Sequence, residues 1–183
     1  MSLLKIKDFD PNFKQHFDNI DIIGFDVYSG QEKIGSIADI LVEETGNIRY
    51  LVINTGIWVV GKKVLLPIGM AKFGPQSKQR VDVNNLSKIQ VETLPNYNET
   101  DVIDFHYEEK VRNVYRTSKI SSLPADFVPP VASTTNSSNY EKDVYNSNSN
   151  LYALNDTDHQ NLRLYKERLI ADKIRNTPFT VKD

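Results

Sequence analysis

The chain has 183 residues, a formal net charge of −2 at pH 7 and no cysteine. The absence of cysteine excludes disulfides, thiolate metal sites and cysteine nucleophiles. A chain with a small net negative charge does not have the broad positive field that attracts nucleic acid. Hydrophobic residues make up 39% of the sequence, below the usual share of a globular chain, so we expect part of it to lie outside the packed core.

The first residues, MSLLKIKDFDP, contain no long apolar core and include acidic residues early, which is unlike a signal peptide. No apolar run approaches the roughly 20 residues that a helix needs to cross a bilayer. We therefore expect a cytoplasmic protein without a transmembrane segment.

Residues 1–21 carry Pro11 in a turn signal and three regularly spaced phenylalanines. The four-residue spacing of Phe9, Phe13 and Phe17 predicts one or two helical turns with an aromatic edge. We expect this segment to pack over one end of the domain that follows.

Residues 22–96 have the pattern of a small antiparallel β-barrel, because short runs of Ile, Val and Leu alternate with turn signals. The expected strands cover residues 22–28, 34–42, 48–54, 64–67 and 80–83, and a short helix begins near residue 86. Gly35 lies inside the second run, where a glycine is typical of the bulge or bend that closes a barrel. Period-two alternation predicts a core made of Ile34, Ile40, Val42, Leu51, Ile53 and Leu66.

Three segments follow the predicted barrel. Residues 97–120 predict a helical extension, in which Glu108 precedes Arg112 by four residues. Residues 121–150 predict a flexible linker, because Ser, Asn, Thr and Pro cannot bury enough apolar surface to offset the entropy of ordering. Residues 151–183 fit either a helix or a strand. The predicted fold class is mainly β, with short flanking helices and a disordered or extended C-terminal region.

Several stretches resemble the PRC-barrel family, which is named after the cytoplasmic domain of the photosynthetic reaction-centre H subunit. They are GFDVYSG, KIGSIADILVEETGNIRYLVINTG and GKKVLLPIG, with Gly35 and Asp39, the run Tyr50-Leu51-Val52, and Lys63 to Pro67 as the matching motifs. The family also includes a domain of a bacterial ribosome-maturation factor. The resemblance implies a β-barrel over residues 22–96.

A narrower resemblance extends beyond the barrel. The stretches LLKIKDFDPNF, WVVGKKVLLPIG and LPNYNETDVIDFHYEEKVRNVYR are similar to AvaK-like akinete-marker proteins of cyanobacteria. The tail RLYKERLIADKIR is similar to the opening of the YsnF/AvaK stress-response domain, which implies a partial domain at residues 151–183. The resemblance implies a cyanobacterial source and a role in stress or dormancy, and it implies no known reaction.

Histidines and acidic residues supply weak candidate sites. His16, His106 and His159 lack the spacing of metal ligands, so we expect exposed or half-buried side chains in flexible regions. The acidic run from Asp101 to Glu109, which includes Asp104 and Glu108, predicts a solvated helix face. Glu43 and Glu44 are expected to be turn residues, and we expect no metal, no cofactor and no catalytic residue.

A modest basic patch is predicted on the second half of the barrel, made of Lys62, Lys63, Lys72, Lys78 and Arg80. With aromatic neighbours such a patch can contact RNA, but the overall negative charge favours a solvated rim.

The run Ile57, Trp58, Val59 and Val60 lies between two glycines, where a hairpin tip is normally polar. Alternation exposes half of these side chains, and an exposed tryptophan is a common anchor of protein interfaces. The alternative is that Phe9 and Phe13 cover this face. The sequence favours a non-enzymatic scaffold that contacts a protein partner or itself, and the alternative is an RNA- or ribosome-associated adaptor.

Overall fold

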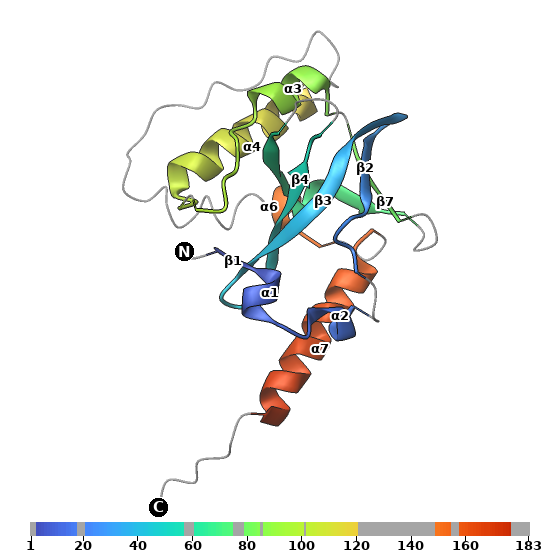
Figure 1. The fold of residues 1–183 in the computed structure, drawn as a ribbon, viewed down its shortest axis with the longest axis vertical. Coiled ribbons are helices and arrows are strands. Elements are labelled where there is room, and N and C mark those ends of the chain that lie inside the picture. Colours follow the sequence, from blue (N-terminus) through green and yellow to red (C-terminus); the bar gives the residue numbers. More distant parts are fainter. Residues whose placement is uncertain are drawn as a thin grey trace, which may run out of the picture.

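The computed structural model describes residues 3–17, 21–56, 61–74, 79–84, 86–100, 102–120, 149–154 and 158–176 (Figure 1). Its strands are β1 (Leu3–Lys5), β2 (Asp26–Ser29), β3 (Glu32–Glu43), β4 (Ile48–Asn54), β5 (Lys63–Pro67), β6 (Ala71–Phe73) and β7 (Arg80–Val83). Its helices are α1 (Ile6–Phe9), α2 (Phe13–His16), the 3₁₀ turn η1 (Ile68–Met70), α3 (Lys88–Thr93), α4 (Phe105–Ile120), α6 (Ser149–Tyr152) and α7 (Gln160–Asn176). The mainly β fold class is confirmed.

The strands form one sheet in the order β5-β4-β3-β2-β7-β6, with β1 paired to β3. All pairs are antiparallel except β2 with β7. The central strand β3 has 12 residues and is long enough to pair with two strands along one edge. On that edge, β2 pairs with its first part, around Gly35, and β1 pairs with its last part, around Val42. Strand β4 pairs with the other edge of β3. This long, twisted strand therefore joins β1, β2 and β4 in one sheet.

Gly35 marks an irregularity in the sheet, as its position inside a strand predicts. The register between β2 and β3 shifts between Val27 and Tyr28, which is a β-bulge. A Cβ atom at Gly35 would lie 2.1 Å from the carbonyl oxygen of Asn54, so only glycine allows β4 to approach so closely.

The core contains all six predicted side chains. However, β4 is buried on both faces from Ile48 to Ile53 and does not alternate between core and solvent. The second face is covered by helices, because Tyr50 contacts α4 and α6, and Tyr115 of α4 donates a hydrogen bond to the Leu65 carbonyl at 3.1 Å. The domain therefore has a helical layer over β4 and β5.

The C-terminal part of the chain folds back onto the sheet. We call residues 149–154 and 158–176, which hold α6 and α7, the C-terminal arm. In Figure 1, α6 lies behind the strands and α7 runs beside α2, near the opposite end of the sequence. Within the described part of this region, Ser149–Tyr152 and Gln160–Asn176 are helical, which decides for these residues between the helix and the strand that the sequence allowed.

Two predicted features lie wholly or mostly outside the described residues. They are the hairpin at residues 57–60 and most of the predicted linker, whose last two residues, Ser149 and Asn150, begin α6. Among the described residues, no helix combines the length and the apolar character that crossing a membrane requires.

Candidate functional site

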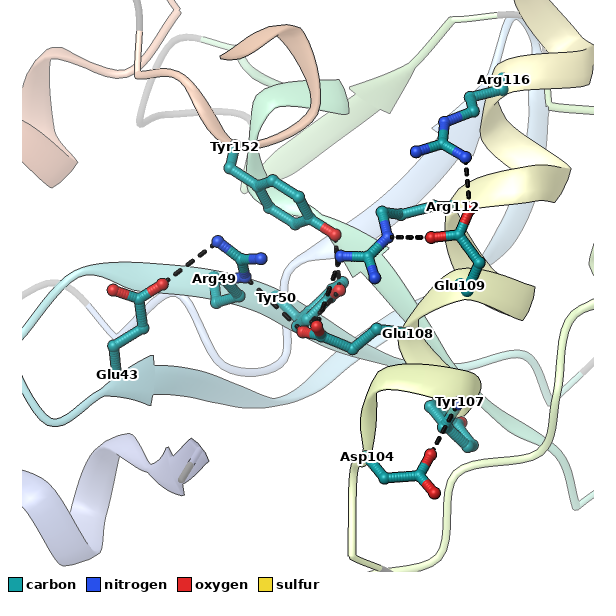
Figure 2. A network of polar contacts seen from close by, with 10 residues as sticks. All are labelled: Glu43, Arg49, Tyr50, Asp104, Tyr107, Glu108, Glu109, Arg112, Arg116 and Tyr152. Atoms are coloured by element: carbon teal, nitrogen blue, oxygen red, sulfur yellow. Dashed lines mark hydrogen bonds and ion pairs between the residues drawn. The ribbon is translucent and has the colours of Figure 1, made fainter. Parts of the chain in front are cut away.

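A cluster of charged and tyrosine side chains joins β4 to α4 and α6 (Figure 2). We call it the polar brace, and its members are Glu43, Arg49, Tyr50, Glu108, Glu109, Arg112, Arg116 and Tyr152. It connects parts of the chain that are far apart in sequence, and it contains most of the buried charge of the described residues.

A bulge in β4 brings two neighbouring side chains to the same carboxylate. Leu41 of β3 pairs with Tyr50 and the next residue pairs with Ile48, so Arg49 is the extra residue of a β-bulge. Neighbours in a regular strand point to opposite faces, whereas a bulge redirects one of them. The Tyr50 hydroxyl donates to Glu108 Oε1 at 3.0 Å, and Arg49 Nε lies 3.6 Å from the same oxygen.

Helix α4 supplies the carboxylate at the centre of the brace. Asp104 caps the helix, because its Oδ1 accepts a hydrogen bond from the backbone nitrogen of Tyr107 at 2.7 Å. The four-residue spacing then places Arg112 Nη1 3.4 Å from Glu108 Oε2. The predicted solvated face is wrong for Glu108, which is 3% exposed, because this side of α4 packs against the sheet.

Glu43 is a second correction to the sequence prediction. It stands at the end of β3 and is buried, and its Oε1 pairs with Arg49 Nη1 at 3.2 Å. Its neighbour Glu44 is exposed, so only one of these two glutamates is an ordinary turn residue. Burying charge is costly unless each group is paired. The brace meets this condition by matching Glu43, Glu108 and Glu109 with Arg49, Arg112 and Arg116.

Tyr152 links the C-terminal arm to the brace. Its hydroxyl lies 2.6 Å from the hydroxyl of Tyr50, and its ring lies 3.7 Å from the Arg49 guanidinium. Burial is the main cause that raises the pKa of both phenols above the ordinary tyrosine value. Both side chains therefore stay protonated at neutral pH, so they can donate hydrogen bonds without adding negative charge.

The start of α7 is held by His159. Its Nε2 lies 3.0 Å and 2.7 Å from the carbonyl oxygens of Ile68 and Ala71, so this nitrogen carries a hydrogen and donates it. His159 is 1% exposed, which corrects the prediction of an exposed or half-buried histidine. This contact fixes α7 to η1 and β6.

The inner face of α7 packs on the N-terminal segment. Tyr165 stacks on Phe17 with ring centroids 4.3 Å apart and an interplanar angle of 10°. Leu169 approaches Gly46 so closely that a Cβ atom there would lie 3.0 Å from the leucine side chain. Phe9 lies beneath Lys173, whose ammonium is 3.9 Å from the ring centroid. The predicted aromatic edge is thus the surface on which α7 lies.

Polar contacts around His16 close the end of this packing. His16 Nδ1 lies 2.8 Å from Asp10 Oδ2, and Nε2 lies 3.1 Å from Asp172 Oδ2. Asp10 also accepts a hydrogen bond from the Tyr165 hydroxyl at 3.5 Å, and Arg168 Nη1 donates to the His16 carbonyl at 3.2 Å. We call Asp10, His16 and Asp172 the histidine clamp. The sequence contains these three residues, but they lie too far apart along the chain to form a recognisable local motif.

The residues of the predicted basic patch are divided between two parts of the sheet. Lys62 donates to two carbonyl oxygens at the end of α3, at 3.2 and 2.6 Å, and Lys63 pairs with Glu99 at 2.9 Å. Arg80 pairs with the aspartate two residues later and lies over a tyrosine ring at 4.0 Å. Lys72 is exposed on β6, at the other end of the strand order from β5.

Other predicted sites lie outside the described residues or lack ligand geometry. Lys78 and the predicted partner-binding run at residues 57–60 are outside the described residues. His106 is exposed on α4. Within the described part of the chain, no group of three or more His, Asp or Glu side chains is placed to hold a metal ion.

Comparison with known proteins is consistent with the mainly β fold. Residues 16–90 match the family described as the PRC-barrel domain. The chain contains a PRC-barrel domain. An uncharacterized protein of Deinococcus radiodurans is 40% identical over 67 residues, which amount to 36% of this chain and 23% of that protein. The match therefore spans less than a quarter of the relative's length. Helix α4 and the C-terminal arm lie outside the PRC-barrel match.

Proposed function

We propose that this chain is a non-enzymatic PRC-barrel scaffold that acts through protein–protein contact, with self-association as its first expected mode. The observation that carries the proposal is the C-terminal arm, which lies outside the PRC-barrel match and packs on a ready-made face of the domain. Such a face, built from Phe9, Phe17 and the β3–β4 hairpin, is suited to receive an amphipathic helix.

The polar brace supports a scaffold more than a catalyst. Each of its carboxylates is in contact with a guanidinium, and its central carboxylate, Glu108, is almost fully buried. A catalytic acid or base must be accessible to the substrate. It must also lie within hydrogen-bond reach of the proton that it transfers. A balanced set of buried ion pairs instead fixes the relative positions of the elements that carry it.

The contact surface proposed for a partner is the run from Ile57 to Val60, on the sequence argument that Trp58 stands in an apolar, glycine-bounded hairpin. Analytical ultracentrifugation of the wild type and of Trp58→Ala tests this. We expect the wild type to associate as concentration rises, and the variant to keep its melting temperature but lose association, since aromatic anchors often contribute about 2 kcal/mol or more. A wild type that stays monomeric throughout would contradict the proposal.

The RNA- or ribosome-associated alternative has less support. Lys62, Lys63 and Arg80 already contact groups of this chain, which leaves fewer cations to neutralise phosphates. An RNA affinity that falls steeply with salt would favour this alternative over the scaffold.

A cytoplasmic role in stress response or dormancy is the physiological part of the proposal. Its support is the resemblance of residues 3–13, 58–69 and the tail to AvaK-like proteins. Comparing protein levels in growing and stressed cells tests it, and unchanged levels would contradict it.

A further inference from the structure

The histidine clamp places both ring nitrogens of one imidazole against carboxylates. Asp10 approaches Nδ1 from the turn between α1 and α2, at 2.8 Å, and Asp172 approaches Nε2 from α7, at 3.1 Å. A carboxylate only accepts hydrogen bonds, so each nitrogen must carry a hydrogen to satisfy its contact. A neutral imidazole has one N–H and leaves one nitrogen lone pair facing a carboxylate oxygen. The clamp is therefore complete only when His16 is the imidazolium.

The surroundings of His16 favour that charged form. Among the described residues, the titratable or charged groups that face it are Asp10 from the turn, and Tyr165, Arg168 and Asp172 from α7. Burial lowers the pKa of His16, but hydrogen bonds to Asp10 and Asp172 outweigh it, and the net pKa lies above the ordinary histidine value. Arg168 opposes the charge but contacts the backbone carbonyl instead of the ring.

We propose that the histidine clamp is a pH-dependent contact between α7 and α2. Protonated His16 holds α7 against α2, and loss of the proton releases the C-terminal part of α7. Release uncovers the aromatic surface formed by Phe9 and Phe17. This deepens the proposed function by adding a second surface that can receive a helix. It rests on the proposed function only for the idea that a partner uses the uncovered surface, because the release itself needs no partner.

The direction of the pH effect follows from the position of the proton. Asp10 belongs to the same segment as His16, so the contact that docking of α7 adds is the one between Nε2 and Asp172, which raises the pKa of His16. Docking is therefore tightest below the pKa of the undocked histidine and weakens as the pH rises through the docked pKa. Between these two values, the docking equilibrium constant falls by up to about tenfold per pH unit. The start of α7 stays attached, because His159 contacts two carbonyl oxygens that do not titrate. The expected motion is therefore a loosening of α7 from Tyr165 onwards.

Hydrogen exchange of the full chain tests the proposal. Exchange into α7 is compared at about pH 5.5 and about pH 8.5, with exposure times corrected for the intrinsic exchange rate. We expect protection of the wild-type segment after Tyr165 to fall several-fold or more at the higher pH, while protection of β4 is unchanged. Equal corrected protection at both pH values would overturn the proposal.

Three variants separate the clamp from general stability. His16→Gln cannot titrate and should show weak, pH-independent protection of α7. Asp172→Asn, at a side chain that is 45% exposed, should move the transition to lower pH, because one stabilising charge is lost. His106→Gln, at an exposed histidine of α4, is the matched control and should behave as the wild type.

Two outcomes concerning the variants would also overturn the clamp. One is a His16→Gln protein that keeps the wild-type pH dependence, and the other is an Asp172→Asn transition at the wild-type pH. The failure of the clamp is distinguishable from failure of the proposed function, because exchange is measured on α7 and association is measured by sedimentation of the Trp58 variant.

Discussion

Replacing Glu108 by Gln is the sharpest test of the polar brace. The substitution keeps the size of the side chain but removes the charge that faces Arg49 and Arg112, at 3.6 Å and 3.4 Å. Removing one partner of a buried ion pair costs about 3–5 kcal/mol. The amide oxygen still accepts from Tyr50, so we expect the lower end, about 3 kcal/mol. For a chain of this size, such a loss lowers the melting temperature by about 6–12 °C.

The measurement is urea unfolding of both proteins, followed by circular dichroism, with thermal melts as a second readout. If the midpoint of urea unfolding falls while the slope of the unfolding free energy against urea concentration is unchanged, stability alone has changed. Glu44→Gln is the matched control, because Glu44 is exposed, and it should stay within about 0.5 kcal/mol of the wild type. Adding Arg112→Gln should cost less than the sum of the single changes, since it restores the charge balance. A Glu108→Gln protein as stable as the control would refute this reasoning.

Two further predictions concern the hairpin and the arm. Glu43→Gln should destabilise the protein by about 1–3 kcal/mol in the same urea assay, because it leaves Arg49 with one carboxylate fewer, and equal midpoints for the Glu43 and Glu44 variants would contradict the pairing. Proteolytic cleavage within residues 121–148 should leave two pieces that co-elute in gel filtration, since the arm buries Leu162 and Tyr165 against the domain. Separation of the pieces without denaturant would show that the arm is held too weakly for this packing.

Features set by local patterns could be predicted from the sequence. The bounds of β4 and β7 match the predicted runs, because alternation and turn residues are properties of neighbouring positions. Gly46 adopts a positive φ of 85° in the predicted hairpin turn, as glycine does there at little cost. The bulge near Gly35 was visible for the same reason, since a glycine inside a strand pattern already indicates an irregularity.

Features set by long-range packing could not be predicted. The i,i+4 relation of Glu108 and Arg112 was clear, but periodicity alone does not reveal which side of a helix faces a sheet. The burial of Glu43 depends on Arg49, whose orientation depends on a bulge that has no glycine to mark it. The short strands β1 and β6 have three residues each, too few to show a period.

The two attachments of the C-terminal arm differ in how they respond to pH. Near α6 the arm is held by Tyr152, whose raised pKa and arginine neighbours keep the contact unchanged around neutral pH. Along α7 it is held by His16, the side chain type that changes charge in that range. A segment fixed at one end by permanent contacts and at the other by a titratable contact can open without leaving the domain. The same chain can therefore cover its aromatic surface at low pH and present it at higher pH.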